Sequence, residues 1–158
     1  QLAAHLGLPY AFASHFAPGQ MMDAIRVYRE QFKPSAALAE PYVMLGISVF
    51  AADSDAEAEL LASSWQQVFV NLFSGTPGQL PPPVANYMSE LPAMQQAMLH
   101  DVLACTMVGT AEKIHQQVND FVAKTGADEL MITSQIYDHQ ARLHSYEIVA
   151  KTLMGTND

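Results

Sequence analysis

The chain is poor in cysteine and in basic residues. Its 158 residues include one cysteine and seven Lys and Arg against sixteen Asp and Glu, which gives a formal net charge of −9. A lone cysteine, Cys105, forms no internal disulfide, so a cytoplasmic setting is the default expectation. Nucleic acids and anionic membranes both attract clustered Lys and Arg. The composition therefore argues against both as partners.

Several sequence signals are also missing. The apolar runs fall far short of the ~20 residues of a membrane-spanning helix, and the start at Gln1 shows no basic segment of a signal peptide. The six histidines form no H-x-x-x-H pair and no C-x-x-C motif occurs, so we expect no metal site. No G-x-G-x-x-G or Walker motif is present, which removes the common nucleotide-binding fingerprints.

The last third of the chain carries the clearest structural pattern. Thr110 is a plausible N-cap and Gly126 a plausible end of one helix. An apolar strand over residues 129–136 follows, and Asp138 is expected to cap a last helix. The predicted buried positions of the two helices are Ile114, Val118, Phe121 and Val122, then Leu143, Tyr146, Ala150 and Leu153. Helix–strand–helix order of this kind is typical of an α/β protein with a parallel sheet.

Two more strands and three more helices complete the expected layout. Residues 9–16 and 42–50 read as strands, residues 21–32 as an amphipathic helix, and residues 94–103 as an apolar helix. A capping box, Ser54 with Glu57, starts another helix. The predicted apolar stripes are Met21, Ile25, Tyr28 and Phe32 in the first of these helices, and Leu61, Trp65, Val68 and Leu72 in the capped one. The segment around Cys105 is apolar, so we expect a buried, unreactive thiol.

One segment lacks periodicity. Residues 74–83 contain four prolines and two glycines, which predicts a loop insertion at about 74–92 within a single domain spanning residues 1–158. Residues 1–7 resemble the end of a helix, with Gly7 as its stop. We therefore expect the chain to be the later part of a longer protein. The alternative is a complete small domain with a short N-terminal helix.

Several motifs match one known family. They are Leu-Ala-Ala at 2–4, Leu-Gly-Leu-Pro-Tyr-Ala-Phe-Ala-Ser-His-Phe-Ala-Pro at 6–18, Pro-Pro-Pro-Val at 81–84, Val-Gly-Thr at 108–110, Thr-Gly-Ala-Asp-Glu-Leu-Met at 125–131, Tyr-Asp-His at 137–139, Ala-Arg-Leu at 141–143 and Ser-Tyr-Glu at 145–147. With them the chain resembles the bacterial luciferase-like, flavin-dependent monooxygenases. The resemblance implies a (β/α)8 TIM barrel, which typically needs about 250 residues. The chain would supply its C-terminal portion, about three parallel strands with flanking helices.

The resemblance also implies a chemistry. Members of the family bind reduced FMN in the barrel mouth and use it with O2 to oxidise a small organic substrate, and a separate flavin reductase supplies the reduced flavin. In the family, the segment that holds the flavin phosphate lies just before the motif found here at residues 2–9. We therefore expect weak or absent FMN binding by this chain alone. We also expect its sheet edges to need a partner, either a second copy or the N-terminal half of the barrel.

Position singles out three candidate site residues. Parallel barrels place their chemistry at the carboxyl ends of the strands, and Ser14, His15 and Phe16 end the first predicted strand. Adjacent strand residues point to opposite faces, so Ser14 and His15 do not form a nucleophile–base pair. We expect one of them to face the cofactor or substrate pocket. The alternative is that His15 faces the helix layer. For the whole chain, the alternatives to an enzyme are a non-catalytic flavin-binding or structural relative and an inactive fragment.

Overall fold

A parallel sheet organises the chain in the computed structural model, which describes residues 1–155. Its central strand is β2 (Val43–Ala51). β1 (Tyr10–Phe12) pairs with the start of β2, β3 (Thr106–Gly109) with its end, and β4 (Glu129–Thr133) with residues 44–48. All three pairings are parallel, which confirms the predicted α/β fold with a parallel sheet. The three predicted strands correspond to β1, β2 and β4, and they lie side by side in that order.

β3 was not predicted from the sequence, and the ends of β1 and β4 were predicted three or four residues too late. β3 is only four residues long, too short for a clear alternating pattern, and it directly follows an apolar helix. β1 ends at Phe12 rather than at residue 16 because the chain turns, and Phe16 N–H donates to the Ala13 carbonyl at 3.0 Å. β4 ends at Thr133 rather than at residue 136. The Ser14–Phe16 segment is therefore a turn beyond the strand.

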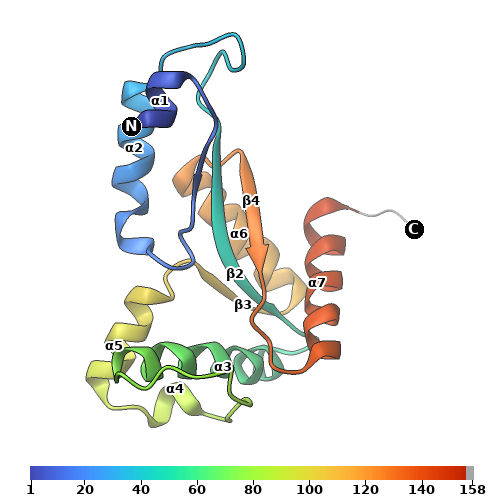
Figure 1. The fold of residues 1–158 in the computed structure, drawn as a ribbon. Helices are drawn as coiled ribbons and strands as arrows, with labels where there is room; N and C mark the ends of the chain where they lie inside the picture. Colours follow the sequence, from blue (N-terminus) through green and yellow to red (C-terminus); the bar gives the residue numbers. More distant parts are fainter. Residues whose placement is uncertain (156–158) are drawn as a thin grey trace.

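Three helices cover one face of the sheet. In Figure 1, α6 (Ala111–Thr125) lies behind β2 and β4, while α2 (Met21–Gln31) and α7 (His139–Met154) flank them. The buried core between these helices and the sheet includes Ile25, Tyr28, Leu45, Ile47, Ile114, Val118 and Val149. The predicted stripes of α2 and α6 are confirmed, with Phe32 and Val122 partly buried beside them.

The predicted stripe of α7 is partly wrong, since Leu153 packs against the core but two other predicted members do not. Leu143 and Tyr146 are 43% and 39% exposed, and the helix instead turns Ser145 and Val149 inward. The reason is a polar contact, because Ser145 Oγ accepts the backbone N–H of Ala51 at the end of β2, at 3.0 Å. The predicted cap is confirmed, since the Asp138 side chain accepts the Ala141 N–H at 2.8 Å.

The helices between β2 and β3 lie beyond the carboxyl ends of the strands. They are α3 (Asp55–Phe73), α4 (Tyr87–Glu90) and α5 (Ala93–Val102), which gather at the bottom of Figure 1. The Ser54 cap is confirmed. The predicted stripe of α3 is partly wrong, since Leu72 is 53% exposed and Phe69 is buried in its place. The reason is that α3 packs on the strand ends rather than along the helix-covered face.

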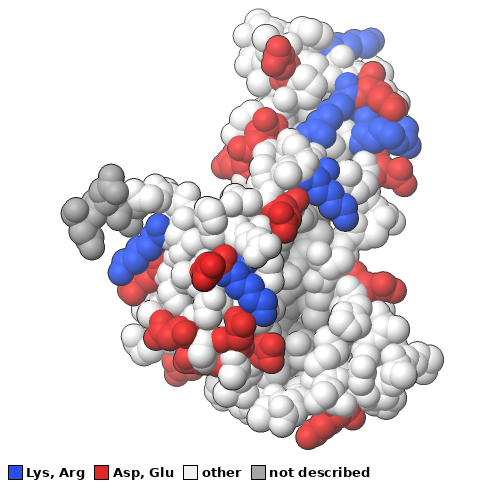
Figure 2. Space-filling view, turned by 180° about the vertical axis from the view of Figure 1, so that it is seen from behind, with Lys and Arg blue, Asp and Glu red and all other residues white. Residues whose placement is uncertain are grey.

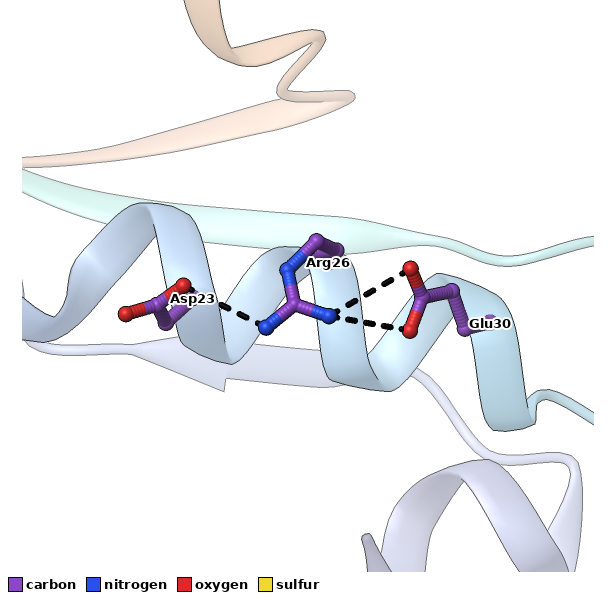
Figure 3. A network of polar contacts seen from close by, with 3 residues as sticks. All are labelled: Asp23, Arg26 and Glu30. Atoms are coloured by element: carbon purple, nitrogen blue, oxygen red, sulfur yellow. Dashed lines mark hydrogen bonds and ion pairs between the residues drawn. The ribbon is translucent and has the colours of Figure 1, made fainter.

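The remaining elements are short or lie at the surface. α1 (Leu2–Leu6) ends at Gly7, whose φ of 62° suits glycine. The segment predicted as an insertion, residues 74–92, holds an irregular stretch followed by the single turn of α4. On the exposed side of α2, Arg26 pairs with Asp23 and Glu30 (Figure 3), at 3.4 and 3.1 Å. Exposed pairs of this kind add little stability.

The basic side chains of the chain lie on or next to the helices that cover the sheet. The seven basic residues are Arg26, Arg29, Lys33, Lys113, Lys124, Arg142 and Lys151. They lie on α2, α6 and α7 or just after α2, and Figure 2 shows Lys and Arg mixed with Asp and Glu on the helix-covered side. In residues 1–155 no helix combines the length and the apolar character needed to cross a bilayer.

Candidate functional site

The two faces of β2 carry different kinds of side chain. Alternation along the strand sends Val43, Leu45, Ile47 and Val49 toward α2, α6 and α7, where all four are fully buried. The opposite face, which we call the inner face, carries Met44, Gly46, Ser48 and Phe50. Figure 1 looks onto this inner face. It is the face that a barrel turns toward its axis.

His15 lies against the inner face. The absence of a side chain at Gly46 makes room for its ring, since a Cβ built on Gly46 would come within 2.7 Å of His15 Cε1. His15 Nδ1 is buried and makes no hydrogen bond of normal geometry with any described residue. Burial lowers the pKa of the imidazole below its ordinary value, and the nearby Gly46 backbone offsets part of this shift. A neutral imidazole is therefore favoured near pH 7.

Ser14 is placed differently. Its hydroxyl donates to the Gly46 carbonyl at 2.5 Å, and the side chain is fully buried. It also lies beside the Cys105 thiol, whose pKa is raised by burial. The predicted burial of Cys105 is confirmed. Ser14 and His15 thus contact the same glycine from different directions, and His15 is the one of the two that lies on the inner face.

Phe16 begins an aromatic row that leads to α3. Its ring centroid lies 4.2 Å from that of His15 and 6.4 Å from that of Trp65, which in turn contacts Phe69 edge-on at 5.0 Å. Phe16 is 57% exposed. The three candidates from the sequence are therefore close together, with His15 and Phe16 on the open side.

Sequence reasoning missed a polar group on the same face. Ser48 Oγ lies 3.3 Å from Thr133 Oγ1, and it donates to Gln135 Oε1 at 3.5 Å. Ser48 is fully buried. The signal that could have found it is a serine at an inner position of an otherwise apolar strand, because buried hydroxyls need partners. The cluster of His15, Ser48, Thr133 and Gln135 is uncharged when His15 is neutral.

A charged pair lies at the rim. His144 of α7 contacts Asp53, just after β2, through its Nε2 at 2.9 Å. This hydrogen bond raises the pKa of His144 above its ordinary value. Both side chains are largely exposed, so the pair connects the end of β2 to α7 without belonging to the buried cluster. Within residues 1–155, His, Cys, Asp and Glu nowhere gather in threes in a way that could hold a metal ion.

The inner-face cluster suits a flat, uncharged ring with polar edges. It offers the partly exposed His15 imidazole, the Thr133 hydroxyl and the Gln135 amide for hydrogen bonds, and Phe16 for stacking. The isoalloxazine ring of a flavin has this character. The cluster contains no Lys or Arg, so it does not provide a charged partner for a phosphate.

Comparison with known proteins gives consistent matches. A family model described as luciferase-like monooxygenase matches residues 1–129. A luciferase-like monooxygenase of Escherichia coli K12 is 47% identical, with 98% of this chain and 47% of the relative covered. The uncharacterized protein YvbT of Bacillus subtilis is 43% identical, with 95% and 45% covered. The chain spans about half the length of the curated relatives it matches.

Solved structures share the fold. The crystal structure of apo-MsnO8 superimposes with a TM-score of 0.77 at 26% identity, covering 99% of this chain and 48% of that one. The oxygenating constituent of 3,6-diketocamphane monooxygenase from Pseudomonas putida, in complex with FMN, superimposes with a TM-score of 0.54 at 17% identity, covering 98% and 44%. The second likeness concerns the fold alone.

Proposed function

Since this chain belongs to the luciferase-like monooxygenase family, we propose that it is part of an enzyme that oxidises a small organic substrate with O2 and reduced FMN. The observation that carries the proposal is the inner-face cluster at the carboxyl end of the parallel sheet, where Gly46 makes room for the partly exposed His15 ring. When bound, reduced flavin would supply the electrons for the reaction. A separate flavin reductase would deliver it in reduced form.

The residues of this chain have distinct tasks in the proposal. His15, as a neutral imidazole, would donate or accept one hydrogen bond at the edge of the ring, and its protonation would be disfavoured by burial. Phe16 would stack on the ring or the substrate and help to exclude water. Gln135 would hold a polar atom in place, because its side-chain oxygen accepts from Ser48 while its amide NH2 group remains available to donate.

The phosphate would be held elsewhere. No Lys or Arg lies on the strands or in the His15–Phe16 turn, and the family's phosphate-binding segment precedes the motif at residues 2–9. We therefore expect this chain alone to bind FMN weakly or not at all. Titration with FMN, followed by flavin fluorescence, tests this expectation. Submicromolar affinity would contradict it.

A partner is also part of the proposal. Within residues 1–155, β1 and β4 pair only with β2, so each has an unpaired outer edge. The accessible surface is 9093 Å² for a mass of 17.3 kDa, against about 7,800 Å² for a typical folded monomer of that mass. The excess supports a second copy or the N-terminal half of a barrel as the missing cover. Light scattering tests this, and a stable, strictly monomeric 158-residue species would count against it.

The experiment that tests the function uses the chain assembled with the rest of its barrel. Reduced FMN and O2 are supplied, and flavin oxidation is compared with product formed from a panel of small organic substrates. A substrate-dependent oxygenated product is the expected result. Flavin binding without any product across the panel would favour the non-catalytic relative.

A further inference from the structure

We propose that Ser145 of α7 is a positioning residue of the inner-face cluster. Through the hydroxyl of Ser134 it fixes the place of Gln135, which lies beside Ser48. This inference deepens the proposed function, because it identifies what holds one polar edge of the same site. It rests on the proposed function only for its effect on the reaction.

The edge of β2 that faces β4 is longer than β4 itself. β4 pairs with residues 44–48, whereas β2 continues to Ala51. The Val49 carbonyl and the Ala51 N–H therefore lie beyond the last residue that β4 pairs with. Both residues are fully buried. Buried backbone groups need hydrogen-bond partners, so something other than a strand must supply them here.

Two serine hydroxyls, which we call the serine pair, take the place of a longer β4. Ser134 Oγ donates to the Val49 carbonyl, and Ser145 Oγ accepts the Ala51 N–H at 3.0 Å. The two hydroxyl oxygens lie 3.3 Å apart. Each hydroxyl has one proton, and that of Ser134 is used by Val49. The proton of Ser145 therefore points to Ser134, and the hydrogen bonds run in one direction from α7 to β2.

The serine pair is sensitive to the loss of either member because both side chains are buried. Removing the Ser145 hydroxyl would leave the Ala51 N–H without an acceptor and Ser134 without its donor. Water does not readily replace a partner at a buried position, so the unpaired groups are unfavourable. We expect the segment after β4 to shift in order to satisfy them.

A shift of this segment changes the inner face, because Ser134 lies between two residues of the inner-face cluster. Thr133 and Gln135 both reach Ser48, while Ser134 points toward α7. The bond from Ser48 Oγ to Gln135 Oε1 is 3.5 Å long, which is at the weak end of the range. The place of Gln135 therefore depends mainly on how its backbone is held, and the serine pair holds it.

The first test removes one hydroxyl and follows Gln135 in ¹⁵N-labelled protein without flavin. Ser145→Ala and Ser134→Ala should each shift the side-chain amide resonances of Gln135. Thr125→Val is the matched control, because its buried hydroxyl also donates to a backbone carbonyl and accepts a backbone N–H, but it lies before the start of β4. All three variants should lower the melting temperature by roughly 2–10 °C. Only the two serine variants should move Gln135.

The second test measures product formed per reduced flavin oxidised in the assembled protein. Gln135→Ala and Ser145→Ala should each lower this yield about tenfold, which is roughly the effect of losing one hydrogen bond. The double variant should be no lower than Gln135→Ala alone, because Ser145 acts through Gln135. A residue that only stabilised α7 would not show this dependence.

Two results would overturn the proposal. One is that the Gln135 resonances stay in place in both serine variants. The other is a double variant whose yield falls by the product of the two single losses. A wild-type protein that forms no oxygenated product, but whose Gln135 resonances shift in the serine variants, would remove the proposed function and leave the positioning role of Ser145 intact.

Discussion

The two faces of β2 differ in what they carry: one face packs the main core, and the other carries the proposed site around Gly46 and Ser48 together with the buried Phe50. Val43, Leu45, Ile47 and Val49 are fully buried under three helices. On the other face of the same strand, Gly46 and Ser48 leave space and hydroxyl groups where larger apolar side chains would pack better. Strand alternation thus allows one nine-residue segment to present a packed core on one side and the proposed binding surface on the other.

Figure 1 shows the surroundings of these two faces of β2. The helix-covered face contains the large core, whereas the inner face is bordered by the turn that carries His15 and Phe16 and by α3. The buried Nδ1 of His15, which lacks a hydrogen-bond partner among the described residues, and the missing side chain at Gly46 add little to stability.

The largest expected effect belongs to the helix-covered face. Ile47→Ala removes a fully buried side chain from the main core, so we expect a loss of about 2–5 kcal/mol in the free energy of unfolding. Met131→Ala is the matched control, because Met131 of β4 is 52% exposed. It should change stability by less than about 1 kcal/mol. Urea denaturation measures the free energy of unfolding of both variants. Similar losses would contradict the expectation that the helix-covered face contributes most of the stability.

Gly46→Ala tests how tightly the inner face is fitted to His15. The new Cβ would come within 2.7 Å of His15 Cε1, so the imidazole must move, with an expected loss of about 1–3 kcal/mol. The double variant Gly46→Ala/His15→Ala should recover most of this loss, because the clash is then removed. Denaturation of the single and double variants gives the coupling. Additive losses would show that His15 does not occupy this position.

The smallest effect concerns the rim pair that ties β2 to α7. The pKa of His144 is raised by its hydrogen bond to Asp53, so the pair stabilises the fold at pH values where His144 is protonated. This contribution is present below the ordinary histidine pKa and disappears as pH rises through the raised value. Asp53→Asn should lower the melting temperature by about 1 °C at pH 5.5, and by nothing measurable at pH 9. An equal change at both pH values would contradict this assignment.

How much could be predicted from the sequence differed along the chain. The stripes of α2 and α6 were read correctly, since both helices pack one apolar face on the sheet. The orientation of α7 was predicted only in part, because it depends on the hydrogen bond from Ala51 N–H to Ser145 Oγ, between residues far apart in the chain. The packing of α3 failed for a related reason. Its partners are the strand ends and not the helix-covered face.

The candidate site, too, could be predicted from the sequence only where local patterns determine it. His15 and Phe16 were found from their position after an apolar strand, which is local information. Thr133 and Gln135 meet Ser48 only because β4 pairs with β2 in one particular register. Register depends on the whole fold. Local patterns therefore located one end of the site, and tertiary pairing supplied the rest.

We infer that the part of the inner face around Gly46 and His15 serves binding and catalysis and contributes little to stability, and the variant His15→Ala tests this inference most directly. Unfolding free energy and product formed per reduced flavin oxidised are measured on the same assembled protein, with His5→Ala as the exposed control. We expect a stability change within about 1 kcal/mol and a fall of at least about tenfold in product formation. Wild-type product yield, or a stability loss comparable to that of Ile47→Ala, would contradict it.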